Sequence, residues 1–154
     1  MEFNIEINAP RERIWGILLG EQTYPMWTAV FSEGSKAVTD WQKGSKALFL
    51  DESNRGMVSR IVENVPNEFL SIEHLGQIKD GVEDYESEEV KKWAGAIENY
   101  TLTDLNGKTN FQVYMEMNEE EKEMIGMFEG MWPKAMAKVK ELAENQDIIP
   151  PVVV

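Results

Sequence analysis

The last part of the sequence predicts one long amphipathic helix, and this helix limits what the rest of the chain can fold into. Asn118 is a suitable N-cap, and the three glutamates after it favour a helix start because they complement the helix dipole. Apolar side chains then recur every three or four residues: Met124, Met127, Phe128, Met131, Ala135, Val139 and Leu142. A stripe of this length must be covered by another large apolar surface.

The segments before this helix predict that surface as a sheet. Residues 2–8 alternate polar and apolar side chains, as a half-buried strand does, and two short helices are expected at 10–20 and 21–28. Further strands are expected at 47–50, 56–65, 69–78, 93–103 and 110–117. The Asn-Gly pair at 106–107 is typical of a tight hairpin. This order predicts an α+β domain in which a strongly curved antiparallel sheet wraps around the C-terminal helix.

Length and charge bound the domain organisation and the partners. The 154 residues suit one domain, expected over 1–145, with an apolar tail at 146–154 that could cover its own body or a neighbouring subunit. A net charge of −13 argues against nucleic acid and anionic membranes, which require clustered Lys and Arg. No apolar run approaches the ~20 residues that a membrane-spanning helix needs.

Cysteine and histidine usage narrows the chemistry. The sequence has no cysteine, which excludes disulfides, thiol nucleophiles and thiolate-bound metals. Because His74 is the one histidine, no site can use two imidazoles. Neither a metal nor a cofactor is expected. The first residues have no basic and apolar signal-peptide regions, so a cytoplasmic protein is expected.

Long stretches of the chain resemble one superfamily. They are INAPRERIWGIL (7–18), WTAVFSEGS (27–35), DWQKGSKALFLD (40–51), GMVSRIVENVPNEFLSIEHLG (56–76), KDGVEDYESEEVKKW (79–93) and MWPKAMAKVKELAE (131–144). In this order they resemble the START-like, or SRPBCC, superfamily. Within it they are similar to bacterial proteins named after the activator of the Hsp90 chaperone ATPase.

The resemblance implies a helix-grip, START/Bet v 1-like fold. Its antiparallel sheet of about six to seven strands grips the C-terminal helix around a cavity, and two short helices follow the first strand. Relatives use that cavity for lipids, sterols, plant hormones and polyketides, and a few are cyclases or hydrolases. The bacterial branch has no uniform catalytic motif, so no catalytic residue is assigned. Resemblance to the eukaryotic activators also implies an extra N-terminal domain that these 154 residues do not contain, which makes a chaperone role a lesser expectation.

Large aromatic and methionine side chains are the candidates for the cavity wall. Flat rings and flexible thioethers suit a pocket for irregular apolar ligands, although each such residue could equally be part of the core. The residues expected to line the cavity are Trp27, Phe31, Phe49, Met57, His74, Trp93, Tyr100, Met127, Phe128 and Met131.

Two polar features have alternative interpretations. His74 lies in register with Leu70 and Ile72, so it is either a structural histidine or a ligand-contacting group that could transfer a proton with a carboxylate or Tyr100. The acidic segment 80–89 lacks calcium-loop spacing, so no metal site is assigned. It is expected to be a solvated loop or a lid at the cavity entrance.

Pro133 divides the long helix into two parts. Proline removes an N–H and crowds the preceding turn, so a kink is expected near residues 129–132. The part after Pro133 is expected to pack on the sheet as core. The part before it, which contains Gly126 and Gly130, is expected to form an adjustable cavity wall.

These observations favour a protein that binds a hydrophobic small molecule in an internal cavity. The alternatives are a cyclase- or hydrolase-like enzyme that uses His74, and an interaction protein with a chaperone partner or a role in stress. A homodimer is a further expectation.

Overall fold

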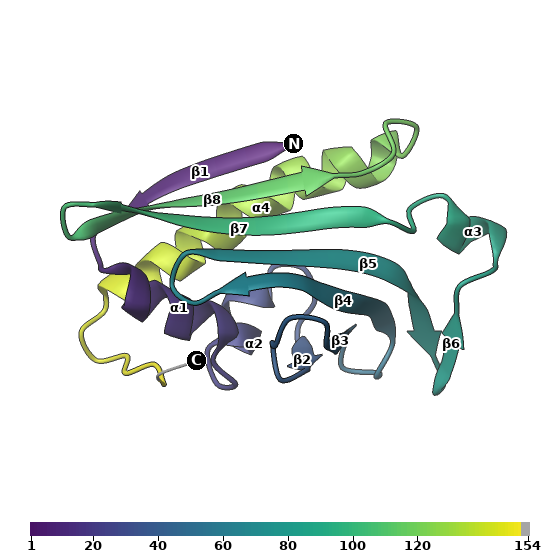
Figure 1. Ribbon diagram of the computed structural model, residues 1–154, viewed down its shortest axis with the longest axis horizontal. Coiled ribbons are helices and arrows are strands. Elements are labelled where there is room, and N and C mark those ends of the chain that lie inside the picture. The colour runs from purple at the N-terminus through teal and green to yellow at the C-terminus, as the bar shows by residue number, and fades with distance from the viewer. Residues whose placement is uncertain (152–154) are drawn as a thin grey trace.

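The computed structural model describes residues 1–151 as an α+β domain (Figure 1). Strands β1 (Glu2–Ile7), β2 (Lys36–Val38), β3 (Lys46–Leu50), β4 (Gly56–Val65), β5 (Phe69–Lys79), β6 (Val82–Asp84), β7 (Ala96–Leu105) and β8 (Lys108–Glu116) form one sheet. The helices are α1 (Arg11–Leu19), α2 (Tyr24–Thr28), α3 (Glu88–Lys91) and α4 (Lys122–Glu144).

The sheet is antiparallel, with the strand order β1-β8-β7-β5-β4-β3-β2 and with β6 paired to the far end of β5. Chain-adjacent strands pair from β2 to β6 and again at β7–β8, whereas β7 pairs with β5 rather than β6, and β1 pairs with β8. The predicted helix-grip fold is confirmed. The sheet has eight strands where six to seven were expected.

Helix α4 crosses one face of the sheet and contacts β1, α1 and α2 (Figure 1). Its C-terminal half provides the core side chains Ala135, Met136, Val139, Leu142 and Ala143. They pack with α1 and with the inward residues of β7 and β8, since alternate residues of a strand point to opposite faces. This packing fixes the end of the molecule away from β6.

The hairpin between β7 and β8 was predicted correctly. Asn106 and Gly107 have φ of 58° and 98°, the positive values that a two-residue primed turn requires at both central positions. Leu105 and Lys108 pair across it.

Several element boundaries differ from those predicted. Helix α4 begins at Lys122, because Asn118 instead closes a turn in which its side-chain oxygen accepts from the backbone N–H of Glu120. Trp93 precedes β7 and follows the unpredicted helix α3, which Ser87 caps. The helix runs unbroken through Pro133, and the expected kink there stays a prediction.

The tail is described as far as Pro151, and its three final valines lie outside the described residues. Pro150 and Pro151 lie on α1 at Gly16, where a Cβ would be only 2.6 Å from the Pro151 carbonyl oxygen. Glycine therefore permits this close approach. Among residues 1–151, no helix is both long and apolar enough to cross a membrane.

Candidate functional site

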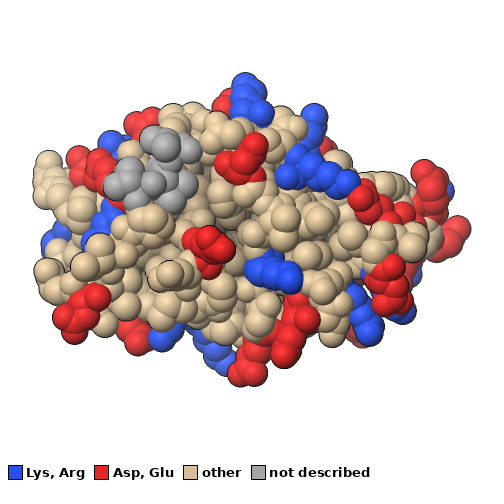
Figure 2. Space-filling model, turned by 90° about the horizontal axis from the view of Figure 1, so that it is seen from below, with Lys and Arg blue, Asp and Glu red and all other residues tan. Residues whose placement is uncertain are grey.

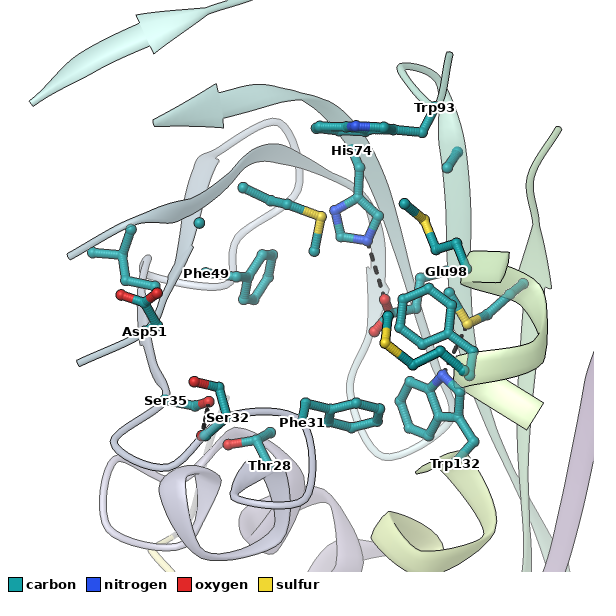
Figure 3. Close-up of a pocket in the computed structure, with 18 of the residues that line it drawn as sticks. Thr28, Phe31, Ser32, Ser35, Phe49, Asp51, His74, Trp93, Glu98 and Trp132 are labelled. Carbon is teal, nitrogen blue, oxygen red and sulfur yellow. Dashed lines mark hydrogen bonds and ion pairs between the residues drawn. The ribbon is translucent and has the colours of Figure 1, made fainter. Parts of the chain in front are cut away.

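A cavity of about 420 Å³ lies between the sheet, α2 and the N-terminal half of α4 (Figure 3). Ligand pockets in proteins commonly occupy about 300–1,000 Å³, so this space is large enough for a small molecule. The sheet contributes one wall from β3, β4, β5, β7 and β8, and helices α2 and α4 contribute the other. Most of the lining residues are aromatic or methionine.

Most of the residues expected at a cavity do line this one. They are Trp27, Phe31, Phe49, Met57, His74, Trp93, Tyr100, Met127 and Phe128. Met131, the tenth, is half-buried on α4 and is not part of the lining. Met124, one turn before Phe128, lines the cavity instead, because residues three and four apart share one face of a helix.

The inner end of the cavity contains a chain of hydrogen-bonded polar groups. His74 Nε2 lies 3.0 Å from Glu98 Oε1, and His74 Nδ1 lies 2.7 Å from the Ser59 hydroxyl. The Tyr100 hydroxyl donates to the second carboxylate oxygen of Glu98. An ionised carboxylate can only accept, so in the neutral ring Nε2 carries the hydrogen and Nδ1 accepts from Ser59. This arrangement fixes both the ring orientation and the tautomer.

Strand pairing places these groups together. An irregularity in the β4–β5 register after Val58 sets Ser59 opposite His74. On β7, Glu98 and Tyr100 share one face because they are two residues apart. Glu98 lies opposite Ile72 and therefore diagonal to His74, within reach of its ring.

Ser59, His74 and Glu98 have the composition of a hydrolase triad but not its accessibility. Ser59 is 0% exposed and is not part of the cavity lining, so its oxygen cannot reach a bound molecule. His74 and Glu98 do line the cavity. Ser59 therefore holds the histidine in place, and the groups that face a ligand are the imidazole and the carboxylate.

Two tyrosines at this end are held in their neutral form. Burial raises the pKa of Tyr100 well above its usual value, and the negative charge of Glu98 raises it further. The pKa of Tyr24 is raised for the same two reasons, with burial again the larger. Both hydroxyls are therefore donors rather than phenolates under ordinary conditions.

Tyr24, Trp27, Tyr100 and Trp132 form an aromatic cluster around this polar end. Their ring centroids are 5.5 Å apart for Tyr24–Trp27, 6.2 Å for Trp27–Tyr100 and 5.9 Å for Tyr100–Trp132. Such spacing is typical of stabilising edge-to-face pairs. The cluster keeps water away from Glu98, whose side chain is 13% exposed.

The opposite side of the cavity is polar. Ser32, Ser35 and Asp51 lie there, across the central space from Glu98 (Figure 3). Asp51 is engaged in the β3–β4 turn, where it accepts from the backbone N–H groups of Ser53 and Arg55. This polar side, called the rim below, combines the carboxylate of Asp51, which holds the turn, with the exposed side chain of Arg55.

The acidic segment 80–89 contains the short strand β6 and the start of α3, joined by turns and bends. Val82–Asp84 pairs with β5, and Lys46 Nζ lies 2.5 Å from Glu83 Oε2. These contacts count against a mobile lid. Within residues 1–151, no three His, Asp or Glu side chains are arranged to hold a metal ion.

The sequence reasoning did not single out Glu98. Its signal is an acid on the buried face of β7, in register with Tyr100 and Leu102, where an apolar side chain is expected. Tyr24 was also missed, because α2 is too short to show helical periodicity.

Comparison with solved structures shows the same fold at low sequence identity. The Aha1 dimer from Colwellia psychrerythraea has a TM-score of 0.73 and 16% identity, over 94% of this chain and 95% of that one. The protein MLL2253 from Mesorhizobium loti has a TM-score of 0.68 and 15% identity, over 92% and 95%. DynU16, a protein of the dynemicin biosynthetic locus, has a TM-score of 0.67 and 12% identity, over 100% of this chain and 49% of that one.

Sequence comparison identifies the family. No curated protein matches the chain. Residues 8–144 match the family described as activator of Hsp90 ATPase homolog 1-like protein, which spans the first helix, the sheet from β2 to β8 and the whole of α4. The chain therefore belongs to the activator of Hsp90 ATPase homolog 1-like family.

Proposed function

We propose that this protein binds a hydrophobic small molecule in the cavity between the sheet and α4. The observation that carries the proposal is the lining itself: aromatic and methionine side chains surround about 420 Å³ of space, with few polar groups among them. Burial of an apolar ligand there gains about 25 cal/mol for each Å² removed from water. Hydroxyl and carboxylate groups at the two ends orient the ligand.

The test uses a neutral fluorescent probe, N-phenyl-1-naphthylamine, and a variant that fills the cavity. Ala96 lines the cavity two residues before Glu98, so Ala96→Trp places a large ring in the space. Thr103→Trp makes a similar change on the exposed face of the same strand. We expect the wild type and Thr103→Trp to bind the probe and Ala96→Trp to lose it.

Two results would overturn this proposal. One is the absence of binding by the wild type for this probe and for a series of medium-chain alcohols. The other is equal binding by Ala96→Trp, which would place the probe elsewhere. Circular dichroism of each variant establishes that it is folded.

A second candidate function is proton transfer to or from a bound ligand. It is favoured by the contact of His74 with Glu98 at 3.0 Å inside the cavity, since a carboxylate held beside an imidazole can act as a general base. The test is deuterium exchange at the carbons beside the carbonyl of 2-octanone, followed by NMR. Faster exchange with wild type than with Glu98→Gln supports the activity, and equal rates reject it.

Two partner hypotheses rest on the relatives alone. The homodimer of the Colwellia protein supports a homodimer here, to be tested by light scattering on the purified protein. The family description supports an Hsp90-type partner, to be tested by co-precipitation with the middle domain of that chaperone.

A further inference from the structure

Glu98 is the one carboxylate at the inner end of the cavity, and its hydrogen-bonding capacity is only partly used. The imidazole of His74 and the hydroxyl of Tyr100 each contact one oxygen of this carboxylate. Each carboxylate oxygen has a second acceptor position, which the contacts with His74 and Tyr100 leave open. A ligand that reaches Glu98 therefore meets an acceptor with negative charge and free capacity.

The surroundings strengthen this preference for positive charge. The aromatic cluster defined above crowds the same end, and ring faces attract cations within about 6 Å. Buried at 13% exposure, Glu98 acts in a medium less polar than water, where attraction between opposite charges is stronger. None of the cavity-lining residues at this end is Lys or Arg.

The net charge of the whole chain also favours a cationic ligand. A net charge of −13 lowers the local concentration of anions and raises that of cations around the molecule. On the face shown in Figure 2, acidic side chains are spread around the outline with basic ones between them. At the rim, the opposite charges of Asp51 and Arg55 offset each other. Glu98 therefore determines the sign of the net charge that lines the cavity.

We propose that the cavity selects an amphiphilic amine, with its protonated nitrogen on Glu98 among the aromatic cluster and its hydrocarbon part along the methionines of α4 and β8. This inference rests on the proposed binding function and names the ligand class for the same site. A carboxylic acid of the same length is excluded from the inner end by the charge of Glu98. An alcohol binds there without the electrostatic gain.

The experiment compares octylamine, 1-octanol and octanoate by isothermal titration calorimetry at neutral pH and low salt. Alkylamines are protonated there because their pKa is about 10.4, as for lysine. We expect octylamine to bind about tenfold more tightly than octanol, because a charge-assisted hydrogen bond is stronger than a neutral one. Octanoate is expected to bind most weakly.

Variants assign that preference to Glu98. Glu98→Gln should lower the affinity for octylamine about tenfold and change the affinity for octanol by less than about threefold. Glu98→Asp keeps the negative charge and should keep part of the preference for the amine. The matched control is Glu73→Gln, which makes the same charge change on β5, at a side chain that pairs with Arg60 outside the cavity. It should leave the ratio of the two affinities unchanged.

The outcomes separate the two proposals. Equal affinity for octylamine and octanol, or tighter binding of octanoate through Arg55, overturns the amine inference and leaves the binding function standing. No binding of any of the three overturns the binding function itself. If Glu98→Gln does not fold, NMR contacts in the wild type decide: the CH₂ beside the nitrogen must lie near the rings of Trp27 and Tyr100, and a position at the rim rejects the inference.

Discussion

The two halves of helix α4 have the same apolar spacing but different surroundings. After Pro133 the helix places Ala135, Met136 and Val139 at 0–2% exposure against the sheet and α1. Before it, Met124 and Phe128 are half-buried at the cavity and Met127 is 49% exposed. One amphipathic pattern therefore produces a close-packed core in one half and a cavity wall in the other.

The difference comes from what each half faces. The C-terminal half lies against β1 and α1, which approach closely because small residues such as Ala135 and Ala143 occupy the contact. The N-terminal half instead places Met124 and Phe128 at the cavity, and its Gly126 and Gly130 are exposed, with nothing within 4 Å of an added Cβ. Core packing thus fixes one end of α4, while the other end has room to adjust to a ligand.

The largest expected effect comes from one substitution made in both halves. Met136→Ala should lower the free energy of unfolding by about 3 kcal/mol, because it leaves a cavity in close-packed surroundings. Met127→Ala should lower it by less than about 1 kcal/mol, since its side chain is half exposed. Urea unfolding followed by circular dichroism measures both. Equal losses would break the distinction between the halves.

The second effect tests how far the polar end of the cavity contributes to stability. His74→Ala removes the partner of both Ser59 and Glu98, so it should cost about 2–3 kcal/mol of the free energy of unfolding. Ser59→Ala, which keeps the His74–Glu98 contact, should cost about 1 kcal/mol and serves as the matched variant. A loss below about 0.5 kcal/mol for His74→Ala would show that the cavity end is not held by this network.

Smaller changes of opposite sign are expected at glycines. Gly126→Ala and Gly130→Ala should each raise the free energy of unfolding by about 0.5–1 kcal/mol, because alanine favours the helix and the space is open. Gly16→Ala on α1 should lower it, since the new Cβ meets the Pro151 carbonyl at 2.6 Å. Thermal unfolding measures all three, and destabilisation by both α4 variants would contradict the open space beside that half.

The smallest effect is confined to alkaline solution. The pKa values of Tyr24 and Tyr100 are raised mainly by burial, so above about pH 10 the unfolded chain loses protons that the folded protein keeps. The free energy of unfolding therefore falls as pH rises above about 10 and is unaffected by these groups below it. Tyr100→Phe should reduce that slope. Absorbance of tyrosinate in the folded protein, equal to that of the unfolded chain near pH 10.5, would contradict the account.

The fold was predictable because its signals are periodic and local. Alternation placed β4 and β5 with ends within one residue, and the apolar spacing of α4 was clear. Boundaries failed where a local side-chain contact decides the outcome, as at Asn118 and at Ser87. These contacts compete with helix propensity and leave little trace in a periodic pattern.

The site was only partly predictable. Bulky side chains such as Phe31 and Met127 stand out in a sequence, and they do meet at the cavity. The contact between His74 and Glu98 joins residues 24 positions apart and depends on strand pairing in the middle of the sheet. In the sequence, such a contact is indicated only by an acidic residue, Glu98, at a strand position where the alternation predicts an apolar side chain.

The most direct test of the central claim is an NMR titration of methionine methyl groups with octanol. Met57, Met115, Met117, Met124 and Met127 line the cavity, whereas Met136 is in the core of the second half of α4 and Met26 is exposed on α2. We predict shifts at the five lining methyl groups, with Met136 and Met26 unchanged. Shifts at Met136 as large as those at Met124 and Met127, or none at the lining methyl groups at saturating octanol, would contradict the division of α4 into core and cavity wall.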